Sequence, residues 1–328
     1  VDFTTYTSVF IPYCTQDVHM GDEPNASYDG GPAIHHVGAH NVYRTLQWIF
    51  RNFPNPSQIF LTGCSAGGTP QPVIYDIINA HYNESAVKID VVMDSPVFLT
   101  PTYFLRNYMP SWNVGTILNE IGFDFDTYMH EESFPDQILD YTLQRAKETD
   151  NFGFVTHDED QLSIFYFTTM SGSLFGGRDR ELSSMDPSFD KFDRSEAPNF
   201  GRRMVGDIRS QWWGKINDSL TRAMDTHSNM NSFIVEGNGH CSFGLNVPLQ
   251  YTGFEEWVSG LVNETEHPDM PSSSPMVLLE NSTLSPTVSP DIIQNVTLAN
   301  MAARRPFPSI AAAAVLLLAL RFLPARVY

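Results

Sequence analysis

The order of strand-like and helix-like segments most strongly limits how this chain can fold. Short apolar runs at Ser8–Cys14, Gln58–Thr62 and Val87–Met93 predict buried strands. Between them, His40–Phe53 and Gln71–Tyr82 repeat apolar residues with the period of a helix. Neighbouring parallel strands need a long crossover connection, and helices commonly provide it. This half of the chain therefore predicts an α/β fold, with a mainly parallel sheet flanked by helices.

The second half continues the pattern less regularly. The aromatic-rich block 100–160 predicts helices, which we expect to form a cap-like insertion over a site. Leu162–Thr169 and Ser232–Val235 predict two further strands, and Met204–Met224 predicts a long helix between them.

Composition then divides the chain into three parts. We expect one α/β domain over residues 1–265, a Pro/Ser-rich linker over 266–306 and a hydrophobic tail over 307–328. The apolar run in the tail has 11 residues, whereas a spanning helix needs about 20. Its length suits a C-terminal lipid-anchor signal better. We expect the tail to attach the protein to a membrane, either as a lipid-anchor signal or as a membrane helix. The alternative is an apolar tail with no targeting role.

Charge excludes one class of partner. The chain carries 38 acidic against 19 basic residues, a net charge of -19. Such a surface repels phosphate backbones, so we expect no nucleic-acid partner.

Sequons and cysteines favour a secreted or cell-surface protein. N-glycans are expected at the Asn-x-Ser/Thr sequons. These are Asn25, Asn83, Asn217, Asn263, Asn281 and Asn295. The cysteine count is odd, at three, and the chain opens on Val1 beside a strand-like run. We therefore expect an absent upstream segment, with Cys64 buried and both Cys14 and Cys241 seeking partners.

The pattern Gly63-x-Ser65-x-Gly67 lies between a predicted strand and a predicted helix. In that setting a serine sits on a sharp turn, and its hydroxyl is exposed as a nucleophile. The backbone N–H of Ala66 is then the predicted oxyanion donor. The alternative is a structural or phosphate-binding turn.

A nucleophilic serine needs a base and an acid. His240 follows a late strand within Gly-Asn-Gly-His-Cys and is the predicted base; otherwise it is a loop histidine bonded to backbone. Four other histidines, at His35, His36, His40 and His81, lie near helix ends and are expected to be structural. Asp94 ends a strand between Ser65 and His240 and is the predicted acid; otherwise it caps a turn.

Four segments together resemble the pectin acetylesterase and Notum family of serine carboxylesterases. They are IPYCTQDVHMGD, LTGCSAGG, VVMDSPVFL and GNGHCSFG. The resemblance covers roughly residues 8 to 260 and implies an α/β-hydrolase-type fold, a Ser-Asp-His triad and no metal or other cofactor. It implies an acetylated polysaccharide such as pectin, or a longer acyl ester, as substrate. By resemblance Ser65 is the nucleophile and His240 the base.

Two departures from the family pattern leave a rival function open. No glycine-rich, tryptophan-containing oxyanion loop is present upstream. The family's aspartate follows a strand that aligns with Ile164–Thr169, where no carboxylate occurs before Asp179. The rival is a catalytically silent surface glycoprotein that keeps the fold as a binding module.

Overall fold

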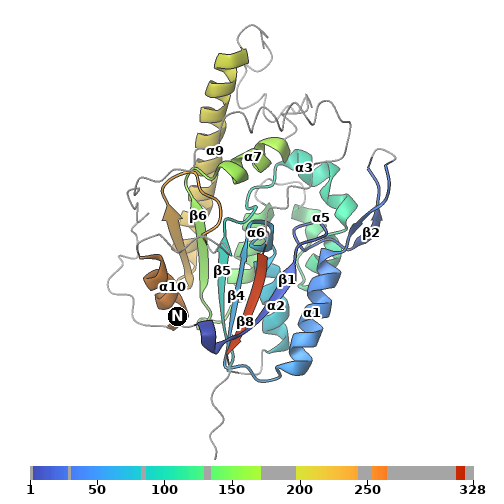
Figure 1. Cartoon of the computed structure of the whole chain (residues 1–328), viewed down its shortest axis with the longest axis vertical. Helices are drawn as coiled ribbons and strands as arrows, with labels where there is room; N and C mark the ends of the chain where they lie inside the picture. Colours follow the sequence, from blue (N-terminus) through green and yellow to red (C-terminus); the bar gives the residue numbers. More distant parts are fainter. Residues whose placement is uncertain are drawn as a thin grey trace, which may run out of the picture.

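The sheet at the centre of the protein has six strands in the order β1-β8-β4-β5-β6-β7 (Figure 1). The computed structural model describes residues 3–28, 31–82, 86–128, 134–170, 197–242, 253–263 and 315–321. The strands of the sheet are β1 (Thr7–Pro12), β4 (Gln58–Cys64), β5 (Lys88–Asp94), β6 (Phe152–His157), β7 (Met230–Val235) and β8 (Val315–Arg321). A separate hairpin pairs β2 (Glu23–Ala26) with β3 (Ile34–His36). Strands β4 to β7 pair in parallel, which confirms the predicted fold class.

Helices cover the two faces of the sheet unequally. The larger apolar core packs α1 (Gly38–Asn52), α2 (Gln71–His81), α6 (Phe134–Leu143) and α9 (Ala197–Thr226) against one face. The other face packs against α10 (Phe254–Asn263), mainly through Trp257 and Leu261. Neighbouring residues of β4 point to opposite faces of the sheet. Leu61 belongs to the larger core, and Phe60 belongs to the core beside α10. A strand buried on both faces has a continuous apolar sequence, as β4 does.

Short helices follow β5 and build a third apolar core, separate from the two on the faces of the sheet. They are α3 (Thr102–Asn107), η3 (Met109–Trp112), α4 (Gly115–Glu120) and α5 (Phe125–Tyr128). Their apolar residues pack with Phe134 and Ile138 of α6 and with Val73 of α2. The predicted helical block is thus confirmed up to α6. Its last part is wrong, because β6 lies within 100–160.

The predicted strand Leu162–Thr169 is also wrong, since it forms helix α7 (Gln161–Met170). The carboxylate of Asp160 accepts hydrogen bonds from Ser163, at 2.9 Å from both the backbone nitrogen and Oγ. A side chain in this position caps a helix N-terminus and stabilises it. The buried residues Ile164 and Phe167 then face the core at helical spacing.

Part of the predicted hydrophobic tail lies inside the sheet. Strand β8 runs antiparallel between β1 and β4, with Leu318 opposite both Val9 and Leu61. The rest of the tail and the predicted linker fall outside the described residues. No helix in the described ranges is long and apolar enough to span a bilayer.

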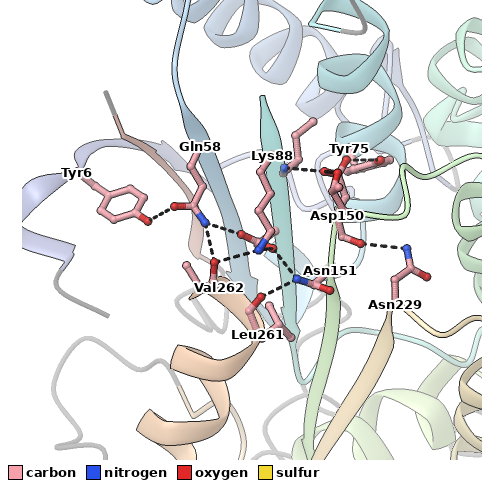
Figure 2. A network of polar contacts seen from close by, with 12 residues as sticks. Tyr6, Gln58, Tyr75, Lys88, Asp150, Asn151, Asn229, Leu261 and Val262 are labelled. Carbon is pink, nitrogen blue, oxygen red and sulfur yellow. Dashed lines mark hydrogen bonds and ion pairs between the residues drawn. The ribbon is translucent and has the colours of Figure 1, made fainter. Parts of the chain in front are cut away.

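A buried polar network attaches the end of α10 to the sheet (Figure 2). Gln58 donates to the carbonyl oxygen of Val262 at 2.9 Å, and Lys88 donates to the same atom at 3.0 Å. Asn151 donates to the carbonyl oxygen of Leu261 at 2.7 Å. These are among the last carbonyls of a helix, which have no partner within the helix. The sheet therefore caps the C-terminus of α10.

Asp90 lies at the centre of this network and is fully buried. It accepts hydrogen bonds from Gln58 at 2.7 Å and Asn151 at 3.2 Å, and pairs with Lys88 at 3.3 Å. Burial raises the pKa of Asp90 to about 7, although Lys88 acts in the opposite direction. The folded protein therefore favours the protonated form more than the unfolded chain does.

We expect Asp90→Asn to flatten the pH dependence of stability. Because the folded pKa is raised, the stability linked to Asp90 is fully present below about pH 4 and is lost as the pH rises to about 7. Asparagine does not titrate. Relative to the native protein, the variant gains about 1.4 kcal/mol per pH unit across that window. Urea unfolding at several pH values measures the difference.

Asp126→Asn is the matched control, because Asp126 is exposed and its replacement changes the net charge equally. It should follow the native pH profile. Parallel profiles for Asp90→Asn and the native protein would contradict the expectation.

Candidate active site

Ser65 lies on a sharp turn between β4 and α2, as predicted. It is buried, and its backbone φ is 56°, in the left-handed region. A non-glycine residue at such an angle is uncommon and is typical of functional turns. Glycines allow the close approach around it: a Cβ on Gly68 would lie 2.9 Å from the carbonyl oxygen of Gly63.

Ala66 occupies the position expected of an oxyanion donor. It is the second residue of the short 3₁₀ helix η2 (Ser65–Gly67), which directly follows β4. A backbone N–H this early in a helix has no acceptor within the helix. It can therefore donate to an anionic oxygen close to Ser65.

His240 is paired with a carboxylate through Nδ1. The Asp160 oxygens lie 2.9 and 2.7 Å from Nδ1 of His240, and Asp160 is fully buried. The other ring nitrogen, Nε2, is buried and has no hydrogen-bond partner among the described residues. A carboxylate at Nδ1 fixes the neutral ring in the tautomer that leaves Nε2 as the acceptor. The pair can thus act as a base held in orientation by an acid.

The prediction that Asp94 is the acid is not what the geometry favours. Asp94 lies at the end of β5, but its Oδ2 accepts the backbone N–H of Ser242 at 2.6 Å. The carboxylate that His240 does contact belongs to Asp160, beyond the neighbouring strand β6. Asp94 is thus bonded to the backbone of the loop that carries His240, whereas Asp160 contacts the imidazole.

A sequence signal for Asp160 was present and was missed. Phe152–His157 is a fully buried strand, and Asp158 and Asp160 follow it directly. The prediction of helices over the whole block 100–160 conceals this strand. The segment after Thr169, which includes Asp179, lies outside the described residues.

A disulfide joins the two halves of the site. Cys64, the residue before Ser65, is bonded to Cys241, the residue after His240. The expectation that Cys241 seeks a partner elsewhere is therefore wrong, while Cys14 is free and exposed. Ligand atoms of Cys64, His240 and Cys241 lie within 4.8 Å of one another. The two sulfurs are bonded to each other, so they do not offer thiolates to a metal.

Ser65 and His240, the predicted nucleophile and base, lie near one another because the disulfide joins the residues next to them. In the part of the chain that the structure describes, no hydrogen bond joins Ser65 Oγ to His240 Nε2. Catalytic hydrogen bonds are often long without substrate and tighten in its presence.

Asp17 and the four histidines that were expected to be structural have partners of their own. Asp17 accepts hydrogen bonds from Thr15, from the backbone of His19 and from Gly38 at the start of α1. His36 bonds the carbonyl oxygen of Thr15. The other three histidines also have partners. His35 is hydrogen-bonded to the carbonyl oxygen of Pro24 and His40 to Arg44, and the ring of His81 stacks on that of Phe50.

The sequons are only partly described. Asn25 and Asn263 are exposed, and Asn217 is half-buried on α9. Asn83, Asn281 and Asn295 lie outside the described residues. Glycosylation stays a prediction.

Comparison with known proteins supports the family resemblance. Residues 1–119 match the family model described as Pectinacetylesterase. The chain is thus similar in this part to the pectin acetylesterase and Notum family, as its motifs predicted. No curated protein matches it in sequence.

Among solved structures, the chain is similar to the Wnt deacylase Notum from Drosophila, at 14% identity and a TM-score of 0.34. That match covers 69% of this chain and 58% of the Notum chain. The similarity is too distant to support a functional argument.

We expect loss of the disulfide to destabilise the protein. Cys241→Ser opens a bridge between residues 177 positions apart, and removing a native disulfide typically costs about 2–5 kcal/mol. Urea unfolding of the variant measures the change. Cys14→Ser is the control and should be neutral, because this thiol is exposed and free.

A thiol titration tests the pairing directly. Unfolded but unreduced protein should expose one reactive thiol, that of Cys14, and the reduced protein three. Three thiols before reduction would show that the bridge is absent.

Proposed function

We propose that the protein is a serine carboxylesterase with Ser65, His240 and Asp160 as its catalytic triad. The observation that carries the proposal is the Asp160–His240 pair, which the disulfide ties to the serine turn. Among the described residues, Nε2 of His240 has no hydrogen-bond partner. The match of residues 1–119 to Pectinacetylesterase supports an ester hydrolase independently of this geometry.

The residues account for both halves of an acyl-transfer reaction. Ser65 Oγ attacks the ester carbonyl, while His240 Nε2 takes the hydroxyl proton. The N–H of Ala66 donates to the oxyanion, at the start of a helical turn whose dipole favours negative charge. The alcohol leaves with the proton from His240, and an acyl group stays on Ser65. Water, deprotonated by His240, then releases the carboxylic acid and restores the serine.

Asp160 orients the imidazole and stabilises its protonated form during each proton transfer. Its carboxylate is fully buried, so the interaction with a charged imidazolium is little weakened by solvent. Because it also caps α7, its own position is fixed by backbone.

O-acetyl groups on a polysaccharide such as pectin are the proposed substrate class, and longer acyl esters are the alternative. The family match supports the first. Because the reaction at the carbonyl is the same for both, acyl-chain preference has to be measured.

A secreted or cell-surface location fits the same proposal. The Cys64–Cys241 disulfide is the kind of bond that persists in oxidising compartments. Exposed sequons at Asn25 and Asn263 are accessible to glycosylation. Attachment to a membrane through the tail stays a prediction.

We expect Ser65→Ala to abolish hydrolysis of 4-nitrophenyl esters. Loss of the nucleophile should lower kcat by at least about a thousandfold. Ser228→Ala, at an exposed turn serine between α9 and β7 that belongs to no sequon, is the control and should be fully active. Acetate preference supports deacetylation of carbohydrate, and long-chain preference supports a lipid ester. If neither the native protein nor Ser65→Ala hydrolyses any ester, the result favours the binding-module function instead.

We expect Asp160→Asn to separate catalysis from stability. Asparagine keeps an oxygen that can cap α7 through Ser163, but it removes the anion that faces His240. Turnover should fall about 10³–10⁴-fold with little change in melting temperature. Steady-state kinetics and thermal unfolding measure the two effects.

Asp158→Asn is the matched control. Asp158 lies in the same loop and accepts the N–H of Gly237 at 2.8 Å, a bond that asparagine can keep. Equal losses of turnover in the two variants would argue against a specific role for Asp160.

A further inference from the structure

The segment that carries His240, residues Gly239–Ser242, has no regular secondary structure. We call it the His240 loop. Its position therefore depends on side chains and on backbone bonds to its neighbours. A displacement of about 1 Å at a catalytic group can cost about a hundredfold in rate. What holds this loop accordingly matters for the reaction.

The end of β5 supplies two of its contacts. Asp94 Oδ2 accepts the N–H of Ser242 at 2.6 Å, and Ser95 Oγ accepts the N–H of Cys241 at 3.1 Å. Asp94 and Ser95 are almost completely buried, so water does not compete for these bonds. They fix the two backbone N–H groups that directly follow His240.

Ser95 is held in an unusual backbone conformation. Its φ is 45°, and its own N–H donates to the carbonyl oxygen of Val155 on β6 at 2.7 Å. Cys241, which it contacts, is also left-handed, with φ at 62°. Left-handed non-glycine residues persist where surrounding bonds over-determine them. Here those bonds hold the Ser95 hydroxyl close to the His240 loop.

The contacts restrain the loop from different directions. The disulfide ties it to the end of β4, Asp94 and Ser95 tie it to the end of β5, and Asp160 holds the imidazole beyond β6. The bonds from Asp94 and Ser95 go to the backbone of the loop, and the bond to the imidazole comes from Asp160.

We propose that Asp94 and Ser95 are positioning residues, which hold His240 in the orientation that Asp160 and Ser65 require. The proposal rests on the proposed esterase function. It assigns Asp94 a role through the backbone of the loop, in place of the acid role expected from the sequence.

Substitutions at Asp94 test this with a built-in comparison. Asp94→Asn keeps an oxygen acceptor for the N–H of Ser242, whereas Asp94→Ala removes it. We expect Asp94→Ala to lower kcat about 10- to 100-fold with a smaller effect on KM, and Asp94→Asn to keep most of the native kcat. Ser95→Ala, which removes only the acceptor of Cys241, should show an intermediate loss. If Asp94→Ala does not fold, Ser95→Ala takes its place in the test.

Thr62→Val is the matched control. Thr62 is buried on β4 and donates to the carbonyl oxygen of Val92 at 3.0 Å, a hydrogen bond that does not involve the His240 loop. It loses one buried hydrogen bond and should keep the native kcat. If Thr62→Val loses as much kcat as Asp94→Ala, general destabilisation explains both and the proposal fails.

A second readout needs no substrate. The proton shared between His240 Nδ1 and Asp160 should give a strongly downfield NMR resonance, as imidazole–carboxylate hydrogen bonds do. We expect this resonance to be lost or shifted in Asp94→Ala and kept in Asp94→Asn. An unchanged resonance and unchanged kcat in Asp94→Ala overturn the proposal.

The two proposals fail in different ways. If the native protein hydrolyses no ester and Ser65 does not react with a fluorophosphonate, the esterase proposal fails. The downfield resonance then still decides whether Asp94 orients His240. If the native protein is active and Asp94→Ala matches it, only the positioning proposal fails.

Discussion

The parallel hydrogen-bond register of β4 to β7 is the constraint on which the site depends. Cys64 pairs with Asp94, Asp94 pairs with Val155, and Val155 pairs with Phe233. Four strands thus pass through one row at nearly the same height. Because the strands are parallel, the segments that follow them all leave the sheet at the same edge. The pairing of the strands therefore brings groups that are distant in sequence close together at this edge.

The row brings these segments to the same edge, and local bonds make the arrangement precise. Ser65, Ser95 and Cys241 all adopt left-handed backbone angles within this region. Such angles cost free energy, on the order of 1–3 kcal/mol each, which surrounding structure has to offset. The disulfide and the buried acceptors of Asp94 provide that support. Backbone strain and a disulfide therefore occur together at this edge of the sheet.

The sequence predicted those features that are encoded locally. The β4–Ser65–α2 turn could be read from one glycine-rich pattern between two periodic segments, and His240 from its place after a late strand. Asp160 could not be assigned without knowing that Phe152–His157 is a strand, and the aromatic surroundings obscured it. The bond between Cys64 and Cys241 was hidden because two loops remote in sequence must first be brought together by the register.

Strand β8 has a consequence for how the molecule is assembled. It lies between β1 and β4 and pairs antiparallel with both, so its hydrogen bonds link β1 to β4. Residues from the first and last parts of the chain are thus neighbours in one sheet. During synthesis β1 and β4 leave the ribosome long before β8, and each has an edge that is unpaired in that interval. Contacts of such high sequence separation form slowly, and exposed edges can pair with other chains. This sheet can therefore be completed only after β8 has been synthesised.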